Sequence, residues 1–265
     1  MNREERFNKI FSTALMALMT LVIVYITVAN YGQTPPGRER LLLLAAAIAS
    51  LCGITSTVLS ANARIANFFF GILNVAVYGA VCFIKGNYGN AAINLLYFLP
   101  MQFVGLASWR RRGDGKKRIR ARRLTPRQRT LFLALFLLGS VITYLVLAWI
   151  KAEAGLSFRE ALLGSDGALR VLRWVIVVDA LATVCNLIGQ YLLSTAYMEQ
   201  WFFWIVVNIS SVVMWSLTAA GDAEAGRNAS LSVIYIVKYA FYLVNALNGL
   251  RIWLNLSRPE GAENR

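Results

Sequence analysis

The chain has 265 residues, of which 58% are hydrophobic and only 15% are charged. This composition excludes an ordinary soluble domain and predicts an all-α polytopic membrane protein. The formal net charge of +14 does not indicate nucleic-acid binding, because most of the excess lies in one short loop between apolar stretches. The chain has no His, and its three cysteines all lie in apolar stretches. We therefore expect no disulfide, no metal or catalytic site and no cofactor.

Eight apolar stretches are long enough to cross a bilayer, which takes roughly 20 residues. They cover about 9–30, 41–61, 66–85, 90–109, 129–150, 172–194, 200–219 and 231–254. The first is too long for the core of a signal peptide, and no small-residue cleavage site follows it. We interpret it as a span, with the alternative that it lies in the membrane interface.

The orientation follows from the basic loop Arg110–Arg129, which reads RRRGDGKKRIRARRLTPRQR. Loops rich in Lys and Arg stay on the cytoplasmic side of a membrane. Counting spans outward from this loop places the N-terminus, with Arg3 and Arg6, on the cytoplasmic side. The tail after Asn255 comes out on the same side, so both termini are expected in the cytoplasm.

Two parts of the chain resemble each other. Asn67–Asn74 (NFFFGILN) aligns with Trp201–Asn208 (WFFWIVVN), and the GLASW segment that ends at Trp109 aligns with the GLRIW segment that ends at Trp253. These matches predict two three-helix repeats that run in the same direction. Parallel repeats are typical of transporters that bind substrate near the middle of the membrane, where the repeats meet.

Two parallel three-helix repeats need one extra span between them to return the chain to its starting side. The expected layout is therefore 3+1+3, preceded by an N-terminal helix. Its parts are an N-terminal cytoplasmic tail and first span at 1–40, the first repeat at 41–109, a basic cytoplasmic loop at 110–128, the linking span at 129–150, the second repeat at 172–254 and a cytoplasmic tail at 255–265.

The stretch Gln200–Trp215 carries polar and aromatic residues at helical spacing. Trp201, Trp204 and Asn208 share one helix face, which Ser211 and Trp215 continue. An amide that faced lipid would be costly, so this face should point into protein or a wet cavity. Indole rings stack and amides form hydrogen bonds, which suits a flat, polar, cationic small molecule. The alternative, that these residues only pack helices together, has equal weight.

Other polar side chains within the spans are candidates for the same site. Gln102 and Asn74 are expected near the middle of the bilayer, and Tyr97, Tyr242 and Asn245 are further candidates. Pro100 lies inside a span, where it should kink the helix and can serve as a hinge.

Asp179 and Lys238 lie at matching depths in the second repeat and are expected to pair across helices. A lone Lys in a span would cost a few kcal/mol, so a partner is needed. A structural ion pair is the first interpretation. Direct contact of Lys238 with substrate and ion coupling through Asp179 are the alternatives.

Three segments together resemble the PnuC family of bacterial vitamin transporters, whose characterised members carry nicotinamide riboside. They are WFFWIVVN (Trp201–Asn208), NLLYFLPMQFVGLASW (Asn94–Trp109) and KYAFYLVNALNGLRIW (Lys238–Trp253), and the resemblance runs from about Leu41 to Trp253. It implies a SWEET-like fold, a homotrimer and a multi-pass protein of the bacterial inner membrane. It also implies facilitated diffusion, with a functional link to a cytosolic kinase that traps nicotinamide riboside by phosphorylation.

The resemblance implies that Trp204 and Asn208 belong to the central site, with Gln102 and Lys238 as polar positions on the third helix of each repeat. Nicotinamide riboside offers a pyridinium on which Trp201 or Trp204 can stack, and amide and hydroxyl groups for the side-chain amides. Phosphorylated nucleotides would need a stronger positive site than one Lys.

Three other functions are considered beside this one. The family has relatives for thiamine and for flavins, which keeps a related vitamin open, and Asp179 keeps an ion-coupled symporter open. A membrane enzyme is disfavoured, because the spans lack His and clustered carboxylates.

Overall fold

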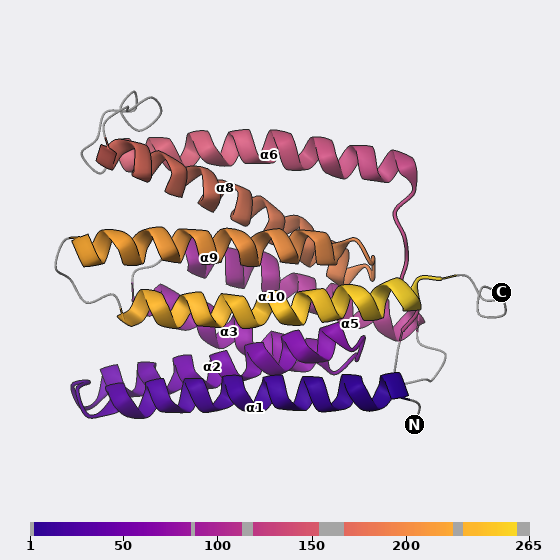
Figure 1. The fold of residues 1–265 in the computed structure, drawn as a ribbon, viewed down its shortest axis with the longest axis horizontal. Coiled ribbons are helices and arrows are strands. Elements are labelled where there is room, and N and C mark those ends of the chain that lie inside the picture. Colours follow the sequence, from indigo (N-terminus) through magenta and orange to yellow (C-terminus); the bar gives the residue numbers. More distant parts are fainter. Residues whose placement is uncertain (1–2, 86–87, 113–118, 154–166, 225–229, 259–265) are drawn as a thin grey trace. The chain divides into compact units, whose positions relative to one another are not determined.

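The structure is a computed structural model that describes residues 3–85, 88–112, 119–153, 167–224 and 230–258 (Figure 1). Within these ranges the regular elements are helices, and one isolated parallel β-bridge joins Arg122 with Tyr197. The helices are α1 (Arg3–Tyr31), α2 (Arg38–Ala61), α3 (Asn67–Ile84), α4 (Tyr88–Ala92), the π-helical η1 (Ile93–Phe98), α5 (Leu99–Arg112), α6 (Pro126–Glu153), α8 (Gly167–Ser194), α9 (Gln200–Glu224) and α10 (Ser230–Leu256).

Seven helices of the described part are long and apolar enough to cross a membrane, which confirms the predicted all-helical membrane protein. They are α1, α2, α3, the helix from Asn90 to Arg112, α6, α8 and α9. The eighth predicted stretch forms α10, which is not one of these seven. Its 27 residues nevertheless give it a length of about 40 Å at the helical rise per residue.

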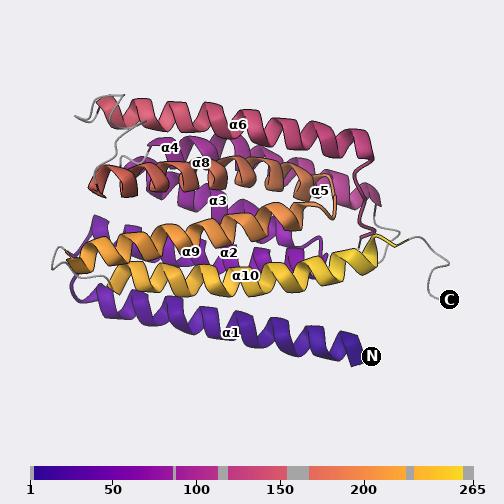
Figure 2. The same ribbon diagram turned by 45° about the horizontal axis from the view of Figure 1, so that its top comes forward.

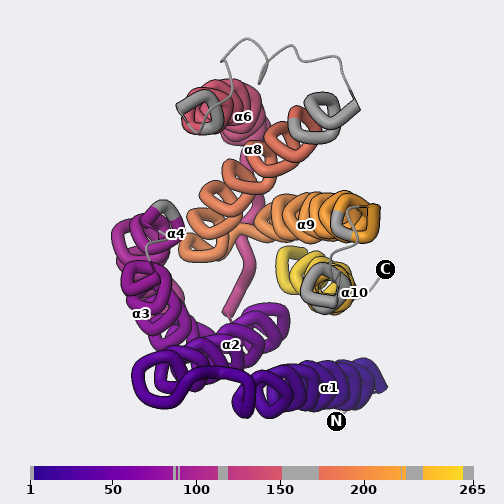
Figure 3. The backbone as a smooth tube through the Cα atoms, turned by 90° about the vertical axis from the view of Figure 1, so that its left-hand side faces the viewer, coloured from indigo at the N-terminus to yellow at the C-terminus, as the bar shows by residue number. Residues whose placement is uncertain are grey.

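The chain divides into two compact units. The first contains Met1–Arg122, Gln190–Met198 and Asn248–Arg265, and the second contains Arg123–Gly189 and Glu199–Leu247. In the first unit α1 packs on α2, α2 packs on α3, and α3 packs on α4, η1 and α5 (Figure 3). In the second unit α6 contacts α8 and α9, and α9 lies beside α10 (Figure 2).

A polar stripe holds α1 in the first unit. Glu4, Asn8 and Ser12 recur every four residues and so share one face of the helix. The Arg251 guanidinium lies 3.6 Å from Glu4 Oε1 and donates to Asn8 Oδ1, while Ser12 Oγ accepts a hydrogen bond of 2.8 Å from Asn62 Nδ2. The first predicted span is therefore a full helix that is tied to the rest of its unit by polar contacts.

Two short turns have the same backbone geometry. One follows α2 and the other follows α8, and each contains an alanine with positive φ, 53° at Ala63 and 63° at Ala196. Ala63 N donates to Ser60 O at 2.9 Å, and Ala196 N donates to Leu193 O at 3.0 Å. Each turn leads into the next helix after the same number of residues. These matching turns are structural support for an internal repeat.

Two tryptophan side chains bind these turns in a crosswise pattern within the first unit. Trp109 Nε1, at the end of α5, donates to Leu193 O at 2.9 Å. Trp253 Nε1, near the end of α10, donates to Ser60 O at 3.0 Å. The two indoles pack 5.4 Å apart, and Phe68 packs edge-on against Trp109 at 4.8 Å. The tryptophan at the end of α5 thus holds the turn after α8, and the tryptophan near the end of α10 holds the turn after α2.

The turns correct the sequence alignment of the repeats by one residue. The alignment paired Asn67–Asn74 with Trp201–Asn208, whereas the structure starts the two helices at Asn67 and Gln200. Asn74 therefore corresponds to Val207 and not to Asn208. The alignment was wrong because it matched aromatic residues and one Asn by type, whereas the true register is set by the backbone conformation of the turns. A shift of one residue matters, because it rotates the corresponding helix face by about 100°.

The burial of the two helices agrees with the corrected register. Phe68 and Trp201 are both buried, and the residues that follow them, Phe69 and Phe202, are both exposed. Because Phe68 is paired with Trp201 only in the register set by the turns, this register matches buried residues with buried ones and exposed residues with exposed ones at the start of the two helices.

The predicted distortion around Pro100 appears in the turn that precedes it. Proline has no N–H to donate, and its ring crowds the carbonyl four residues earlier, which belongs to Leu96. The helix accommodates this with the π-helical segment η1, which ends two residues before Pro100. Tyr97 lies in this wider turn, as does Asn94, which is buried and donates to Asn90 O at 2.8 Å.

Candidate functional site

Gln102 is the most enclosed of the predicted site residues in the first unit. It lies on α5 with 5% of its surface exposed, and its carboxamide lies against Gly71 of α3. A Cβ added at Gly71 would come within 2.8 Å of Gln102 Cδ and closer still to Oε1. In the described residues, no donor reaches Gln102 Oε1. A buried amide oxygen without a donor is uncommon in proteins, and a polar ligand can supply the missing hydrogen bond.

The two other predicted residues of the first unit come from α3 and η1. Asn74 is half-buried, and its carboxamide lies against Gly53 of α2, where an added Cβ would meet Cγ, Nδ2 and Oδ1 at 3.1 Å. Tyr97 is also half-buried, and its ring centroid is 5.6 Å from that of Phe98. Glycines thus make room for two of the three predicted polar side chains in this unit.

In the second unit, α9 turns its predicted polar face inward. Trp201, Asn208 and Ser211 are 2%, 6% and 7% exposed, and Trp204 is half-buried. The opposite face is apolar and exposed, at Phe202, Val206, Ile209 and Val213. This division agrees with the expectation that the amide and indole groups avoid lipid.

The indole of Trp204 packs against Gly189 of α8. A Cβ added at Gly189 would lie 3.2 Å from Trp204 Cε2 and 3.4 Å from Cζ2. These distances are tighter than most contacts of a real Cβ, so the glycine lets the indole approach the backbone of α8. The position of the predicted stacking ring therefore depends on a residue outside its own helix.

Lys238 on α10 lies among three tyrosine rings. Its ammonium nitrogen is 5.6 Å from the ring centroid of Tyr235, 5.5 Å from that of Tyr239 and 5.6 Å from that of Tyr242. Rings at this distance attract a cation through their quadrupoles. The lysine therefore has a favourable environment built largely from its own helix.

The same tyrosines connect α10 with the polar face of α9. Trp215 stacks on Tyr235 with centroids 4.2 Å apart and ring planes 14° from parallel. The Tyr239 hydroxyl is hydrogen-bonded to the Ser211 side chain. Two members of the predicted α9 face are thus in contact with α10 rather than with lipid.

In the part of the chain that the structure describes, no ion pair joins Asp179 to Lys238, and Asp179 is exposed on α8. The sequence argument assumed that only a carboxylate could offset the cost of a lysine in a span. The aromatic rings around Lys238 provide an alternative. Asn245, also on α10, is almost fully buried at 1% exposure.

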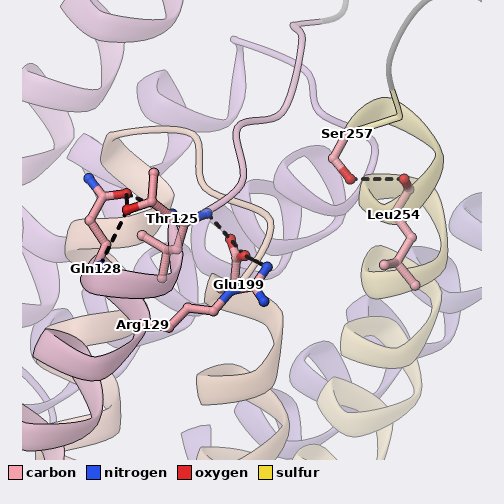
Figure 4. Close-up of polar contacts among 7 residues, drawn as sticks. Thr125, Gln128, Arg129, Glu199, Leu254 and Ser257 are labelled. Carbon is pink, nitrogen blue, oxygen red and sulfur yellow. Dashed lines mark hydrogen bonds and ion pairs between the residues drawn. The ribbon is translucent and has the colours of Figure 1, made fainter.

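Glu199 was not identified from the sequence as a structural residue. Its carboxylate is buried, accepts a hydrogen bond of 3.0 Å from Leu124 N and lies 3.6 Å from Arg129 (Figure 4). Thr125 N donates to Gln128 Oε1 at 2.9 Å and begins α6 beside it. The start of α9 is thereby joined to the start of α6. A single carboxylate between two apolar stretches is typical of a solvated loop, so nothing in the pattern of residues indicated this role.

Gly71 and Gly189 were also missed. The only signal is that glycine is a poor helix former, so a glycine inside an apolar helix needs a packing or functional reason. Of the ten predicted residues, Gln102, Asn74 and Tyr97 belong to the first unit and the other seven to the second. Among the described residues, no cluster of His, Cys, Asp and Glu could hold a metal ion.

Comparison with known protein families gives one match that covers most of the chain. Residues 43–255 match the model of the family described as nicotinamide mononucleotide transporter. The matched range begins in α2 and ends in α10, so it includes every predicted site residue.

Relatives of known name are similar over most of their lengths. The chain is 31% identical to a nicotinamide riboside transporter PnuC of Neisseria mucosa over 223 residues, which cover 82% of this chain and 74% of that protein. It is 28% identical to that of Haemophilus influenzae, over 94% and 91% of the two chains. A crystal structure of the vitamin B3 transporter PnuC superimposes with a TM-score of 0.58 at 27% identity, over 91% of both chains.

Proposed function

Because the chain belongs to the nicotinamide mononucleotide transporter family of membrane transporters, we propose that it takes up nicotinamide riboside. The observation that carries this proposal is its likeness, over most of the chain, to proteins named as nicotinamide riboside transporters. The predicted site residues support the same substrate, since they combine indole rings with amides and include only two charged side chains, Lys238 and Asp179.

In the proposed site Trp204, with Trp201 nearby on the same face, stacks on the pyridinium ring. Asn208, Gln102 and Asn74 bind the amide and the ribose hydroxyls, and the remaining contacts come from Tyr97, Tyr242, Asn245, Lys238 and Asp179. Gln102 supports this assignment best, because its buried Oε1 has no donor within the described ranges. A ribose hydroxyl or the substrate amide would provide one.

The riboside is favoured over the mononucleotide, although the family description names the latter. A phosphate group carries up to two negative charges at neutral pH and is bound tightly by several cationic or N–H donors. Lys238 is the only cation among the predicted site residues, and its ammonium already lies among three tyrosine rings. A site of this kind suits a cationic ring and a neutral sugar.

The transport mode forms part of the proposal. Two parallel three-helix repeats joined by α6 would form a SWEET-like 3+1+3 transporter that alternates access to the two sides. The basic loop supports an inner-membrane protein with both termini in the cytoplasm. Diffusion down the gradient would then be followed by phosphorylation by a cytosolic nicotinamide riboside kinase. The resemblance to the family also supports a homotrimer.

The test of this function uses the purified full chain. Calorimetry should show saturable binding of nicotinamide riboside. Nicotinamide mononucleotide, thiamine, riboflavin and nicotinamide, measured in parallel, should bind at least about tenfold more weakly, which corresponds to 1.4 kcal/mol. Binding of thiamine or riboflavin alone would replace the proposed substrate by a related vitamin.

Proteoliposomes without any kinase separate diffusion from ion coupling. Labelled nicotinamide riboside should equilibrate across the membrane without accumulating, and ionophores that dissipate proton and sodium gradients should leave its rate unchanged. Accumulation that collapses with a gradient would instead establish a symporter, for which Asp179 is the candidate coupling residue.

A further inference from the structure

Gly71 occupies a special position in the first unit. It is buried in the second turn of α3, and the space where a side chain would begin is filled by the tip of another residue. The Gln102 carboxamide from α5 lies there, with Cδ 2.8 Å from an ideal Cβ position, and Ser56 Oγ of α2 lies 3.2 Å from it. Three helices therefore meet at a point that only a glycine backbone leaves open.

The second repeat fills the corresponding position in the opposite way. The matching turns place Gly71 at the same distance from its helix start as Trp204 from the start of α9. In α9 that position carries the large indole, and the glycine is on the neighbouring helix at Gly189. In the first repeat the glycine is Gly71 on α3, and the polar side chain that lies against it, Gln102, comes from α5.

We propose that Gly71 is a positioning residue that fixes the place of the Gln102 carboxamide and thereby sets the affinity for substrate. This inference rests on the proposed function, in which Gln102 Oε1 accepts a hydrogen bond from the substrate. Gly71 itself touches no substrate. It acts by leaving room for the oxygen end of the Gln102 amide to approach the backbone of α3.

The physical consequence of filling this space can be derived. The atoms that an added methyl group would meet belong to the end of a flexible side chain and not to backbone. The cheapest response is therefore a rotation of the Gln102 side chain, which leaves the helices in place. Alanine is also a better helix former than glycine. Gly71→Ala should consequently keep the fold and its thermal stability while misplacing the amide oxygen.

The experiment measures binding of nicotinamide riboside to full-length purified variants by calorimetry, together with the melting temperature of each protein without ligand. Gly71→Ala should bind about tenfold more weakly, the loss expected for one misplaced hydrogen bond in a buried site. Its melting temperature should be equal to or higher than that of the wild type.

A double variant distinguishes positioning from general damage. If Gly71 acts only through Gln102, then Gly71→Ala should cause no further loss in a Gln102→Ala background, because coupled residues are not additive. Gly79→Ala is the matched control. It lies two turns along the same helix face and would press on Leu95, at 2.7 Å, instead of Gln102. We expect it to lower the melting temperature and to leave the affinity within about twofold of wild type.

The results separate the inference from the function on which it rests. If the wild type does not bind nicotinamide riboside, the proposed function is wrong, and the same cycle is measured with whichever vitamin binds. If Gln102→Ala binds as well as wild type, the assignment of Gln102 and the role of Gly71 both fall. If Gln102→Ala is weakened while Gly71→Ala is not, or if the two losses add in full, only the role of Gly71 is overturned.

Discussion

Helices α3 and α9 start from turns of the same geometry and bury matching residues in their first turn, and one of the positions at which they differ lies beside predicted site residues. At that position α3 has Gly71 and α9 has Trp204. The start of the helix is thus the same in the two predicted repeats while the side chains differ. In α9 an indole occupies this position, and beside α3 the Gln102 carboxamide of α5 occupies the space that Gly71 leaves.

The largest effect is expected on the α9 side of this comparison. Trp204→Ala should weaken binding of nicotinamide riboside about 30-fold, since stacking of a desolvated cation on an indole is worth about 2 kcal/mol. Loss of the Asn208 amide in Asn208→Ala should cost about tenfold. Phe202→Ala is the control on the same helix, because Phe202 is 49% exposed, and calorimetry should show wild-type affinity for it. Unchanged affinity in both Trp204→Ala and Asn208→Ala would remove α9 from the site.

A smaller effect is expected on the α3–α5 side. Gln102→Ala should reduce affinity about tenfold and should hardly change the melting temperature. The reason is that Gln102 Oε1 has no donor to lose among the described residues. Gln190→Ala provides the contrast, because Gln190 Nε2 donates to Ser194 Oγ at 3.2 Å. It should lower the melting temperature and keep the affinity. The reverse pattern would show that Gln102 is a packing residue.

The equivalence of the two turns can be tested through their tryptophans. Trp109→Phe and Trp253→Phe each remove one indole N–H, so the carbonyls of Leu193 and Ser60 lose one of their two donors and keep the backbone bond of the turn. Each should lower the free energy of unfolding by about 1–2 kcal/mol. Denaturant titration in detergent should give similar values for the two variants. A large effect in only one of them would show that the turns match in shape and not in energetic role.

The smallest effect concerns a feature found only at the second turn. Glu199→Gln keeps an acceptor for Leu124 N and removes the charge opposite Arg129, which is 56% exposed in its side chain. Because the guanidinium of Arg129 stays in contact with solvent when Glu199 becomes neutral, no unpaired charge is left buried, and the expected loss of stability is below about 1 kcal/mol. Glu199→Ala, which also removes the acceptor, should cost more. Equal losses in the two variants would assign the whole effect to the carboxylate charge.

Much of the fold could be predicted from the sequence because it depends on composition and spacing. Long apolar stretches require helices in a bilayer, and the face of α9 follows from helical periodicity. Pro100 indicated that its helix would be irregular nearby, and the π-helical segment η1 lies just before it. The predicted register of the repeats was wrong by one residue, because the true register depends on the positive φ of Ala63 and Ala196. An alanine in the sequence does not indicate that conformation.

The sequence was less informative about the neighbours of the site residues. The tyrosines around Lys238 lie three positions before it and one and four positions after it in the sequence. An ion pair with Asp179 was nevertheless predicted, because a carboxylate is a stronger partner for an ammonium group than an aromatic ring. The glycines at 71 and 189 carry no chemistry of their own. Their role depends on which side chain of another helix enters the space, and that is a property of tertiary packing.

The crosswise bonds of Trp109 and Trp253 have a mechanical consequence. Both indoles are fully buried and each joins the end of one repeat to the turn of the other. Separating the helices at this end of the first unit would break two buried bonds and expose two large rings at once. The opposite ends of α2 and α3 are joined by the ion pair of Glu39 with Lys85, whose side chains are exposed, and such pairs contribute little stability. The end with the two indoles is therefore the harder of the two to open.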